Sequence, residues 1–135
     1  MTYDIRLAFY SDDAGVHTGI WDQLRRAYAI AEIYEIGGDP ANANARAGWY
    51  VVPSVDDVPG VHVAFSPHDS FSPGSVDLAD FRSPGAMTLL FGANHRSNAF
   101  AAPYVVAIPT PGGGSLWSFT AAAIALHHLT GGADG

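Results

Sequence analysis

The chain has 135 residues and a mass of 14.2 kDa, which suits one domain over residues 1–135 with frayed last residues. Hydrophobic residues make up 48% of it, so the composition argues against intrinsic disorder. With no cysteine, disulfides, thiolate metal sites and a cysteine nucleophile are excluded. No apolar run reaches the about 18 to 20 residues of a membrane span, and no targeting peptide is visible. We therefore expect a cytoplasmic protein without a membrane partner.

The charge is acidic and unevenly distributed. Thirteen Asp and Glu residues stand against six basic residues, all of them Arg, which gives a net charge of -7. The stretch 81–133 contains no acidic residue at all. Because phosphate neutralisation dominates nucleic-acid affinity, a general nucleic-acid binder should carry a basic patch. We therefore expect no DNA partner, and an RNA partner stays open without support from the charge.

The hydrophobic pattern predicts strands that alternate with helices. Alternating residues indicate a strand over Tyr3–Tyr10, and the i, i+3/i+4 spacing of apolar residues indicates a helix over His17–Ala31. Apolar runs bounded by Pro, Gly or Ser are typical of strands covered on both faces. The sequence therefore predicts an α/β domain with a mostly parallel sheet flanked by helices. The further expected elements are strands over Ile33–Ile36, Val61–Phe65, Met87–Phe91 and Tyr104–Ile108, a helical turn over Pro40–Ala47, a short helix over Ser75–Phe81 and a last helix over Leu116–Leu129.

Two expected strand ends lead into loops of small residues. Residues 89–96 read Leu-Leu-Phe-Gly-Ala-Asn-His-Arg, and residues 112–117 read Gly-Gly-Gly-Ser-Leu-Trp. Glycine lets the backbone approach a ligand closely, and the start of a helix offers unpaired N–H groups. Ligands of open α/β sheets bind where strands end. Taken singly, each loop is better explained as an ordinary turn, with Ser115 as a helix N-cap.

Taken together, these residues resemble motifs two and three of the SPOUT methyltransferases, in particular the SpoU/TrmH-type RNA 2′-O-ribose methyltransferases. The likeness covers Met87–Leu129, about a third of the chain. It rests on Phe91-Gly92, on Ile108-Pro109 at a strand end and on Ser115-Leu116 at the start of an alanine-rich helix. The resemblance implies an α/β fold with a C-terminal trefoil knot, S-adenosylmethionine as cofactor, RNA ribose as acceptor and a homodimer.

The resemblance also implies which residues line the cofactor. Gly92, Ile108, Ser115 and Leu116 would do so, and Phe65 or Ser66 would close a third wall. The loops that carry Gly92, Ile108 and Ser115 are then expected to converge at the carboxyl edge of the sheet.

Several positions depart from the family pattern. Asn94 stands where the family has Glu, and Trp117 stands where it has Asn. Motif one uses an Arg on the first helix, for which Arg25 or Arg26 is the candidate. The implied catalytic residues are thus Arg25, Arg26 and Asn94, although a solvated helix face explains the two arginines equally well. Trp117 is expected either to point into the cofactor site, obstructing an acceptor, or to turn into a dimer or helix-packing core.

No metal is expected. The pairs His68-Asp69 and His127-His128 lack the spacing of a three-ligand site, and His127 and His128 suit the negative end of the last helix. The apolar faces of the first and last helices predict a homodimer, because a small sheet could not cover them all. These faces comprise Trp21, Leu24 and Tyr28 on the first helix, and Leu126 and Leu129 on the last.

Two functions follow from these observations. One is an S-adenosylmethionine-dependent methyltransferase with the RNA ribose 2′-hydroxyl as acceptor. The other is a catalytically inactive protein of the same fold that binds a ligand or partner. The loop pattern favours the enzyme, whereas the acidic charge, Asn94 and Trp117 favour the inactive binding module.

Overall fold

A computed structural model of the chain describes residues 4–11, 18–43, 46–66, 75–91, 102–112 and 116–131. Within these residues, seven strands form one sheet in the order β3-β2-β1-β6-β4-β7-β5, and every neighbouring pair is parallel. The strands are β1 (Ile5–Tyr10), β2 (Ile33–Ile36), β3 (Trp49–Val52), β4 (His62–Ser66), β5 (Val76–Asp77), β6 (Met87–Phe91) and β7 (Tyr104–Ala107). The predicted α/β class with a mostly parallel sheet is confirmed.

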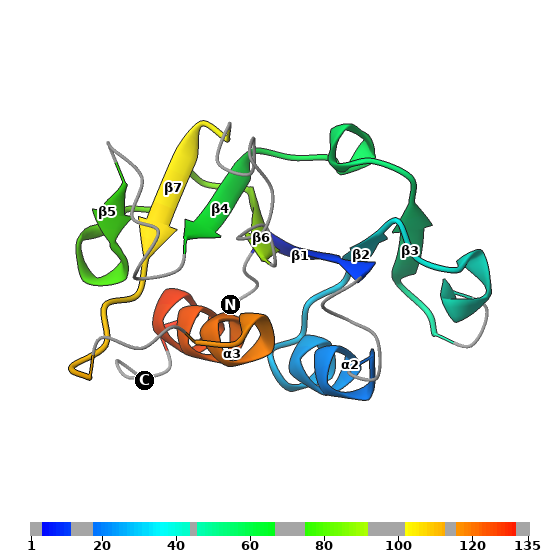
Figure 1. Cartoon of the computed structure of the whole chain (residues 1–135), viewed down its shortest axis with the longest axis horizontal. Helices are drawn as coiled ribbons and strands as arrows, with labels where there is room; N and C mark the ends of the chain where they lie inside the picture. Colours follow the sequence, from blue (N-terminus) through cyan, green and yellow to red (C-terminus); the bar gives the residue numbers. More distant parts are fainter. Residues whose placement is uncertain are drawn as a thin grey trace.

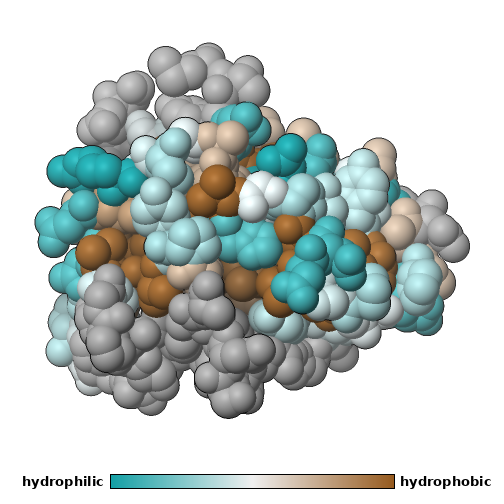
Figure 2. Space-filling model, turned by 90° about the horizontal axis from the view of Figure 1, so that it is seen from above, coloured by the Kyte–Doolittle hydropathy of each residue, from teal (hydrophilic) through white to brown (hydrophobic). Residues whose placement is uncertain are grey.

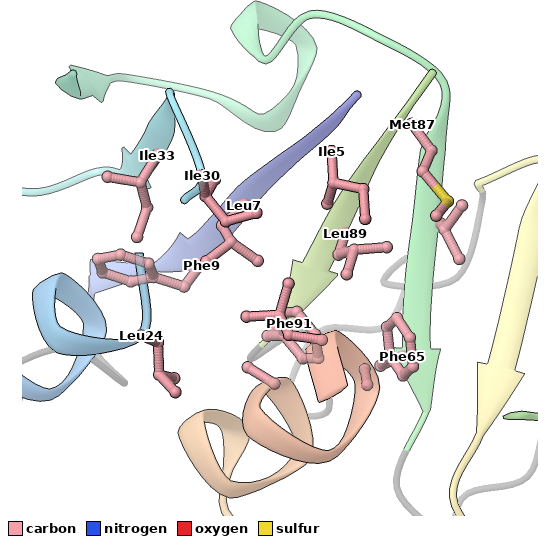
Figure 3. Packing of buried hydrophobic residues seen from close by; sticks show 14 of the residues in the cluster. Ile5, Leu7, Phe9, Leu24, Ile30, Ile33, Phe65, Met87, Leu89 and Phe91 are labelled. Atoms are coloured by element: carbon pink, nitrogen blue, oxygen red, sulfur yellow. The ribbon is translucent and has the colours of Figure 1, made fainter. Parts of the chain in front are cut away.

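Both α-helices of this part of the chain cover the same face of the sheet. Helix α2 (Thr18–Ala27) lies below β1 and β2, and α3 (Ser118–Leu129) lies below β6 and β4 (Figure 1). Alternate residues of the strands point toward the helices, as Leu7, Phe9 and Leu89 show in Figure 3, and all three are fully buried. The larger hydrophobic core therefore lies between the sheet and the two helices.

The opposite face of the sheet is covered without an α-helix in the described residues. A connection with the 3-10 helix η2 (Val55–Asp57) passes over this face from β3 to β4 (Figure 1). Val58 from this connection packs with Ala8, Tyr34 and Leu90 in a second, smaller core. Figure 2, seen from above, shows hydrophobic residues in several places between hydrophilic side chains. Because both faces are covered, all five residues of β6 are buried.

The first helix ends earlier than predicted because the chain turns at Ala29. The expected helix over His17–Ala31 runs only from Thr18 to Ala27. Ala29 has a φ of 55°, and the amide of Ile30 donates to the carbonyl of Arg25 at 2.8 Å. The amide of Ala29 donates to the carbonyl of Arg26 at 3.3 Å. This pair of bonds is a Schellman motif, with alanine where glycine is usual.

Two other stretches differ from the prediction. The helix expected over Ser75–Phe81 is wrong, because Val76 and Asp77 pair with β7 as strand β5 and the following residues form the 3-10 helix η4 (Leu78–Asp80). Strand β3 was not predicted. The turn expected over Pro40–Ala47 is the 3-10 helix η1 (Pro40–Ala43). Strands β2 and β6 have the predicted bounds. The trefoil knot stays a prediction, because residues 92–101 and 113–115 lie outside the described ones.

Candidate functional site

The carboxyl ends of three neighbouring strands meet at one edge of the sheet. Strand β4 lies between β6 and β7, with Ala64 opposite Leu90 and Phe65 opposite Val106. Because these strands are parallel, the chain leaves β6 after Phe91 and β7 after Ala107 at the same edge. This is the edge where ligands of open parallel sheets bind. The convergence of the Gly92 and Ser115 loops there stays a prediction, since both residues lie outside the described part.

Two stacked phenylalanines form the inner wall of this edge. The ring centroids of Phe65 and Phe91 lie 4.7 Å apart with an interplanar angle of 17°. Both residues are almost fully buried, and Figure 3 shows them beside α3. Ile108 packs against the same core but keeps part of its surface accessible, and Leu116 is also half-buried. Phe65 is thus first a core residue, whereas Ile108 and Leu116 can still contact a ligand.

Trp117 lies where α3 begins and is exposed. Its side chain is 71% accessible, and its ring centroid lies 5.5 Å from that of Phe119. The backbone of Trp117 caps the helix, because its carbonyl accepts a hydrogen bond of 2.9 Å from the amide of Ala121. The expectation that Trp117 turns into the helix-packing core is therefore wrong. Its exposure also means that it does not fill a closed site within this chain, while a place in a dimer stays a prediction.

Arg25 and Arg26 both pair with Asp22. Arg25 donates from Nη2 and Nε to Oδ1 at 3.0 and 3.2 Å, and Arg26 donates from Nε to Oδ2 at 3.2 Å. The Arg25 side chain is only 16% exposed and reaches the backbone near Gly48, whereas that of Arg26 is 67% exposed. Arg26 thus lies on the solvated helix face that the sequence left open. Helix α2 reaches the Phe65–Phe91 pair through Trp21, whose ring centroid lies 5.9 Å from that of Phe91, whereas the two arginines are engaged with Asp22.

Three of the predicted site residues lie in the parts of the two motif loops, at 92–101 and 113–115, that the structure does not describe. Gly92, Asn94 and Ser115 lie outside the described residues, so their predicted roles stay predictions. Ser66 ends β4 at the predicted edge. Across the residues that are described, no three His, Asp or Glu side chains gather in a way that could hold a metal ion. His127 instead links the helices, with Nδ1 at 3.2 Å from the hydroxyl of Tyr28.

A buried carboxylate at the end of β2 was missed by sequence reasoning. Glu35 is 1% exposed, and its Oε1 accepts a hydrogen bond of 3.1 Å from Nε1 of Trp49. Asn42 Nδ2 lies 3.1 Å from both carboxylate oxygens. A charged residue inside the apolar run of β2 was the available signal, because such residues are rarely buried without partners. Glu35 holds the connection from β2 to β3 in place.

A second cluster surrounds Glu32 before β2. Glu32 Oε1 accepts hydrogen bonds from the hydroxyl of Tyr34 at 2.6 Å and from Nε of Arg6 at 2.9 Å. These two bonds lower the pKa of Glu32. Burial and the bond to Glu32 raise the pKa of Tyr34 to about 12. The cluster lies at the amino-terminal side of the sheet and therefore supports the fold rather than the candidate site.

Comparison with solved structures identifies the architecture. No family model and no curated protein sequence matches the chain. The structure of TrmJ from Z. mobilis ZM4 matches with a TM-score of 0.63 at 15% identity over 98% of this chain and 70% of that one. An AdoMet-bound rRNA methyltransferase from Sinorhizobium meliloti matches with a TM-score of 0.64 at 21% identity over 92% of this chain and 54% of that one. The chain has the fold of the SPOUT RNA methyltransferases.

A third match has nearly the same length as this chain. A structure reported for the 2-OH methylation of C/U34 on tRNA matches with a TM-score of 0.57 at 17% identity over 94% of both chains. The resemblance drawn from residues 87–129 is thus confirmed for the fold. The chain spans only about half of the Sinorhizobium meliloti protein, at 54% of its length.

Proposed function

We propose that the chain binds S-adenosylmethionine at the carboxyl edge of β6, β4 and β7 and transfers its methyl group to a ribose 2′-hydroxyl of RNA. The observation that carries the proposal is the meeting of three parallel strand ends beside the start of α3. Support comes from the shared fold, since one of its members is AdoMet-bound and another is reported for 2-OH methylation of tRNA.

The described residues at this edge suit the adenosine part of the cofactor. The buried, stacked Phe65 and Phe91 give this edge a rigid apolar support, and the half-buried Ile108 and Leu116 offer the accessible apolar surface. The space around Gly112 is open, because an added Cβ would meet nothing within 4 Å. Apolar surface with a few polar groups is the usual lining of small-molecule sites. The residues present therefore fit the cofactor.

When bound, S-adenosylmethionine supplies an electrophilic methyl group. The chain must hold the acceptor hydroxyl in line and remove its proton. Arginine stays charged at physiological pH, so Arg25 and Arg26 could bind the acceptor but could not act as a base. Arg26, with a 67% exposed side chain, is the better placed of the two to meet RNA, whereas Arg25 positions Asp22. Asn94 would contribute a polar contact rather than a proton acceptor.

We also propose that two copies pair through α3, although three of the five residues first expected at this contact are buried in their own chain. Trp21, Leu24 and Leu126 are buried within their own chain, so the argument from their exposure is wrong. Helix α3 instead contains no Asp, Glu, Lys or Arg, and Ile124 on its outer side is 41% exposed. Apart from Ser118, Thr120, His127 and His128 its residues are apolar, which is unusual for a helix with one side in solvent. A second copy of the chain would cover this side, and the cytoplasmic location stays a prediction.

Binding and transfer are tested separately. Calorimetry with S-adenosylhomocysteine should detect binding, and Ile108→Ala should weaken it several-fold, because a side chain at the proposed lining is removed. Val61→Ala is the matched control, since Val61 is 40% exposed and precedes β4, at the end of that strand opposite to the proposed site. Transfer is then measured with tritiated S-adenosylmethionine and total RNA. Absence of cofactor binding at millimolar ligand would overturn the proposal.

The inactive binding module is the second candidate. It is favoured by the engagement of Arg25 and Arg26 with one carboxylate and by the net charge of -7. This candidate predicts binding of S-adenosylhomocysteine without methyl transfer to RNA. The two measurements therefore distinguish the candidates.

No helix in the described part of the chain is both long and apolar enough to cross a membrane.

A further inference from the structure

The three tryptophans of the chain lie in contrasting environments. Trp21 and Trp49 are 0% and 2% exposed, whereas Trp117 is 71% exposed. An indole is a large hydrophobic surface that proteins usually cover. A tryptophan left in solvent next to a candidate site therefore needs a separate explanation.

Trp117 is held firmly although it is exposed. Its carbonyl is fixed by the first hydrogen bond of α3, from the amide of Ala121. Its ring meets Phe119 at 5.5 Å and an interplanar angle of 60°. Phe119 in turn packs against the main core. The indole thus contacts a residue that packs against the core, while most of its own surface stays exposed.

The described cations are already engaged in contacts within the chain. Arg6 pairs with Glu32, and Arg25 and Arg26 pair with Asp22. Arg46 lies over the ring of Trp49 at 5.2 Å, and Arg82 donates to the carbonyls of Ala79 and Phe81. Contacts with phosphate would have to compete with these interactions. Stacking on an aromatic ring needs no charge and can supply affinity for a nucleic acid on an acidic protein.

We infer that Trp117 binds the RNA acceptor by stacking on one of its unpaired bases. The inference rests on the proposed function and names the part of the acceptor that the chain contacts. Stacking tolerates any base, because every base has a π-face, and it requires the base to be outside a duplex. The acceptor would thus be a loop or single-stranded nucleotide, bound beside the carboxyl edge of the sheet.

The test measures RNA binding without cofactor. Fluorescence anisotropy of labelled decaadenylate gives the affinity for the wild type and the variants. Trp117→Ala should weaken binding by roughly 5- to 100-fold, and Trp117→Phe should retain part of the affinity, because a ring remains. Tyr50→Ala is the matched control. Tyr50 is an exposed aromatic residue, 47% accessible, that lies on the edge strand β3 and should not affect binding.

Tryptophan emission supplies a second readout. Trp117 is the accessible indole, so decaadenylate should quench emission in the wild type and in Tyr50→Ala but not in Trp117→Phe. Affinity should also fall only weakly with salt, because few phosphate contacts contribute.

Three results would overturn the inference. The first is an affinity for decaadenylate that Trp117→Ala leaves unchanged, and the second is no binding of decaadenylate by the wild type. The third is a wild-type dimer in which acrylamide does not quench Trp117 and which Trp117→Ala dissociates. The last result would assign Trp117 to contact between two copies. A wild type that binds decaadenylate through Trp117 but does not bind S-adenosylhomocysteine would remove the proposed function instead.

Discussion

The hydroxyl of Tyr34 donates a 2.6 Å hydrogen bond to the carboxylate of Glu32, two residues before it. Burial, and then this bond, raise the pKa of Tyr34 from its ordinary 10.0 to about 12. The folded state therefore holds the Tyr34 proton more tightly than the unfolded state. The stabilisation is fully present below pH 10 and is lost as the pH rises toward about 12.

Replacing Tyr34 should make the loss of stability at alkaline pH smaller. Tyr34→Phe removes the titrating hydroxyl and its hydrogen bond, at a cost of about 1 kcal/mol in the free energy of unfolding at neutral pH. Chemical denaturation between about pH 9 and 12 should then show a difference in the free energy of unfolding between wild type and variant that becomes smaller as the pH rises. A difference in the free energy of unfolding that stays constant over this range would contradict the stabilising role of the Tyr34 hydroxyl.

The Glu32 carboxylate affects the stability of the fold at acid pH. Its pKa is lowered first by the bond from Tyr34 and then by that from Arg6. The stabilisation is therefore present above its ordinary pKa of 4.5 and is lost as the pH falls through the lower folded value. Glu32→Gln should flatten the acid limb of the stability profile, which denaturation at low salt measures.

The turn at the end of α2 offers a stabilising substitution. Ala29 has a φ of 55°, in the left-handed region that glycine adopts without strain. Ala29→Gly should therefore raise the free energy of unfolding by about 1 kcal/mol. Ala27→Gly, at the last residue of the helix two positions earlier, should instead lower it by about 0.5 kcal/mol, because Ala27 has a helical conformation in which glycine is the less favourable residue. Thermal melts of both variants check the contrast, and equal effects would show that the turn is not under strain.

Gly38 lies so close to Glu35 that a side chain cannot be added. A Cβ at this position would overlap the Glu35 carboxylate, which Trp49 and Asn42 hold in place. Gly38→Ala should lower the free energy of unfolding by about 1 to 3 kcal/mol. Gly112→Ala is the control, because its Cβ would meet open space. Chemical denaturation compares the two, and a neutral Gly38→Ala would show that Glu35 can move aside.

The proposed pairing through α3 has a simple test. Ile124 is 41% exposed on the outer side of the helix. Ile124→Asp would place a charge in the interface and should convert a dimer into a monomer of 14.2 kDa. Light scattering at micromolar concentration measures the mass. A wild type that is already monomeric would contradict the pairing, and Val76→Asp controls for added charge at an exposed edge strand.

Strands with neighbours on both sides were predictable from the sequence, whereas edge strands were not. Met87–Phe91 is a run of apolar residues that ends in glycine, and β6 has those bounds. Strand β3, which pairs only with β2, was missed although Trp49-Tyr50-Val51-Val52 are residue types that favour strands; the run has four residues, and Tyr50 is 47% exposed. Strand β5 has two residues, too few for any period. Edge strands depend on their partner rather than on their own pattern.

The sequence was enough to propose an edge of the sheet for the candidate site, but not the contacts of its side chains. The expected parallel strands and the small residues after them indicate one edge, where the structure brings the ends of β6, β4 and β7 together. The pairing of Asp22 with Arg25 and Arg26 could have been read from the i, i+3 and i, i+4 spacing. The exposure of Trp117 could not, because tryptophan is highly buried on average.

Calorimetric titration of the wild type with S-adenosylhomocysteine tests the central claim most directly. We predict saturable binding that Ile108→Ala weakens several-fold and Val61→Ala leaves unchanged. Absence of binding at millimolar ligand, or equal affinity in Ile108→Ala and the wild type, would contradict the assignment of the cofactor to the edge formed by β6, β4 and β7.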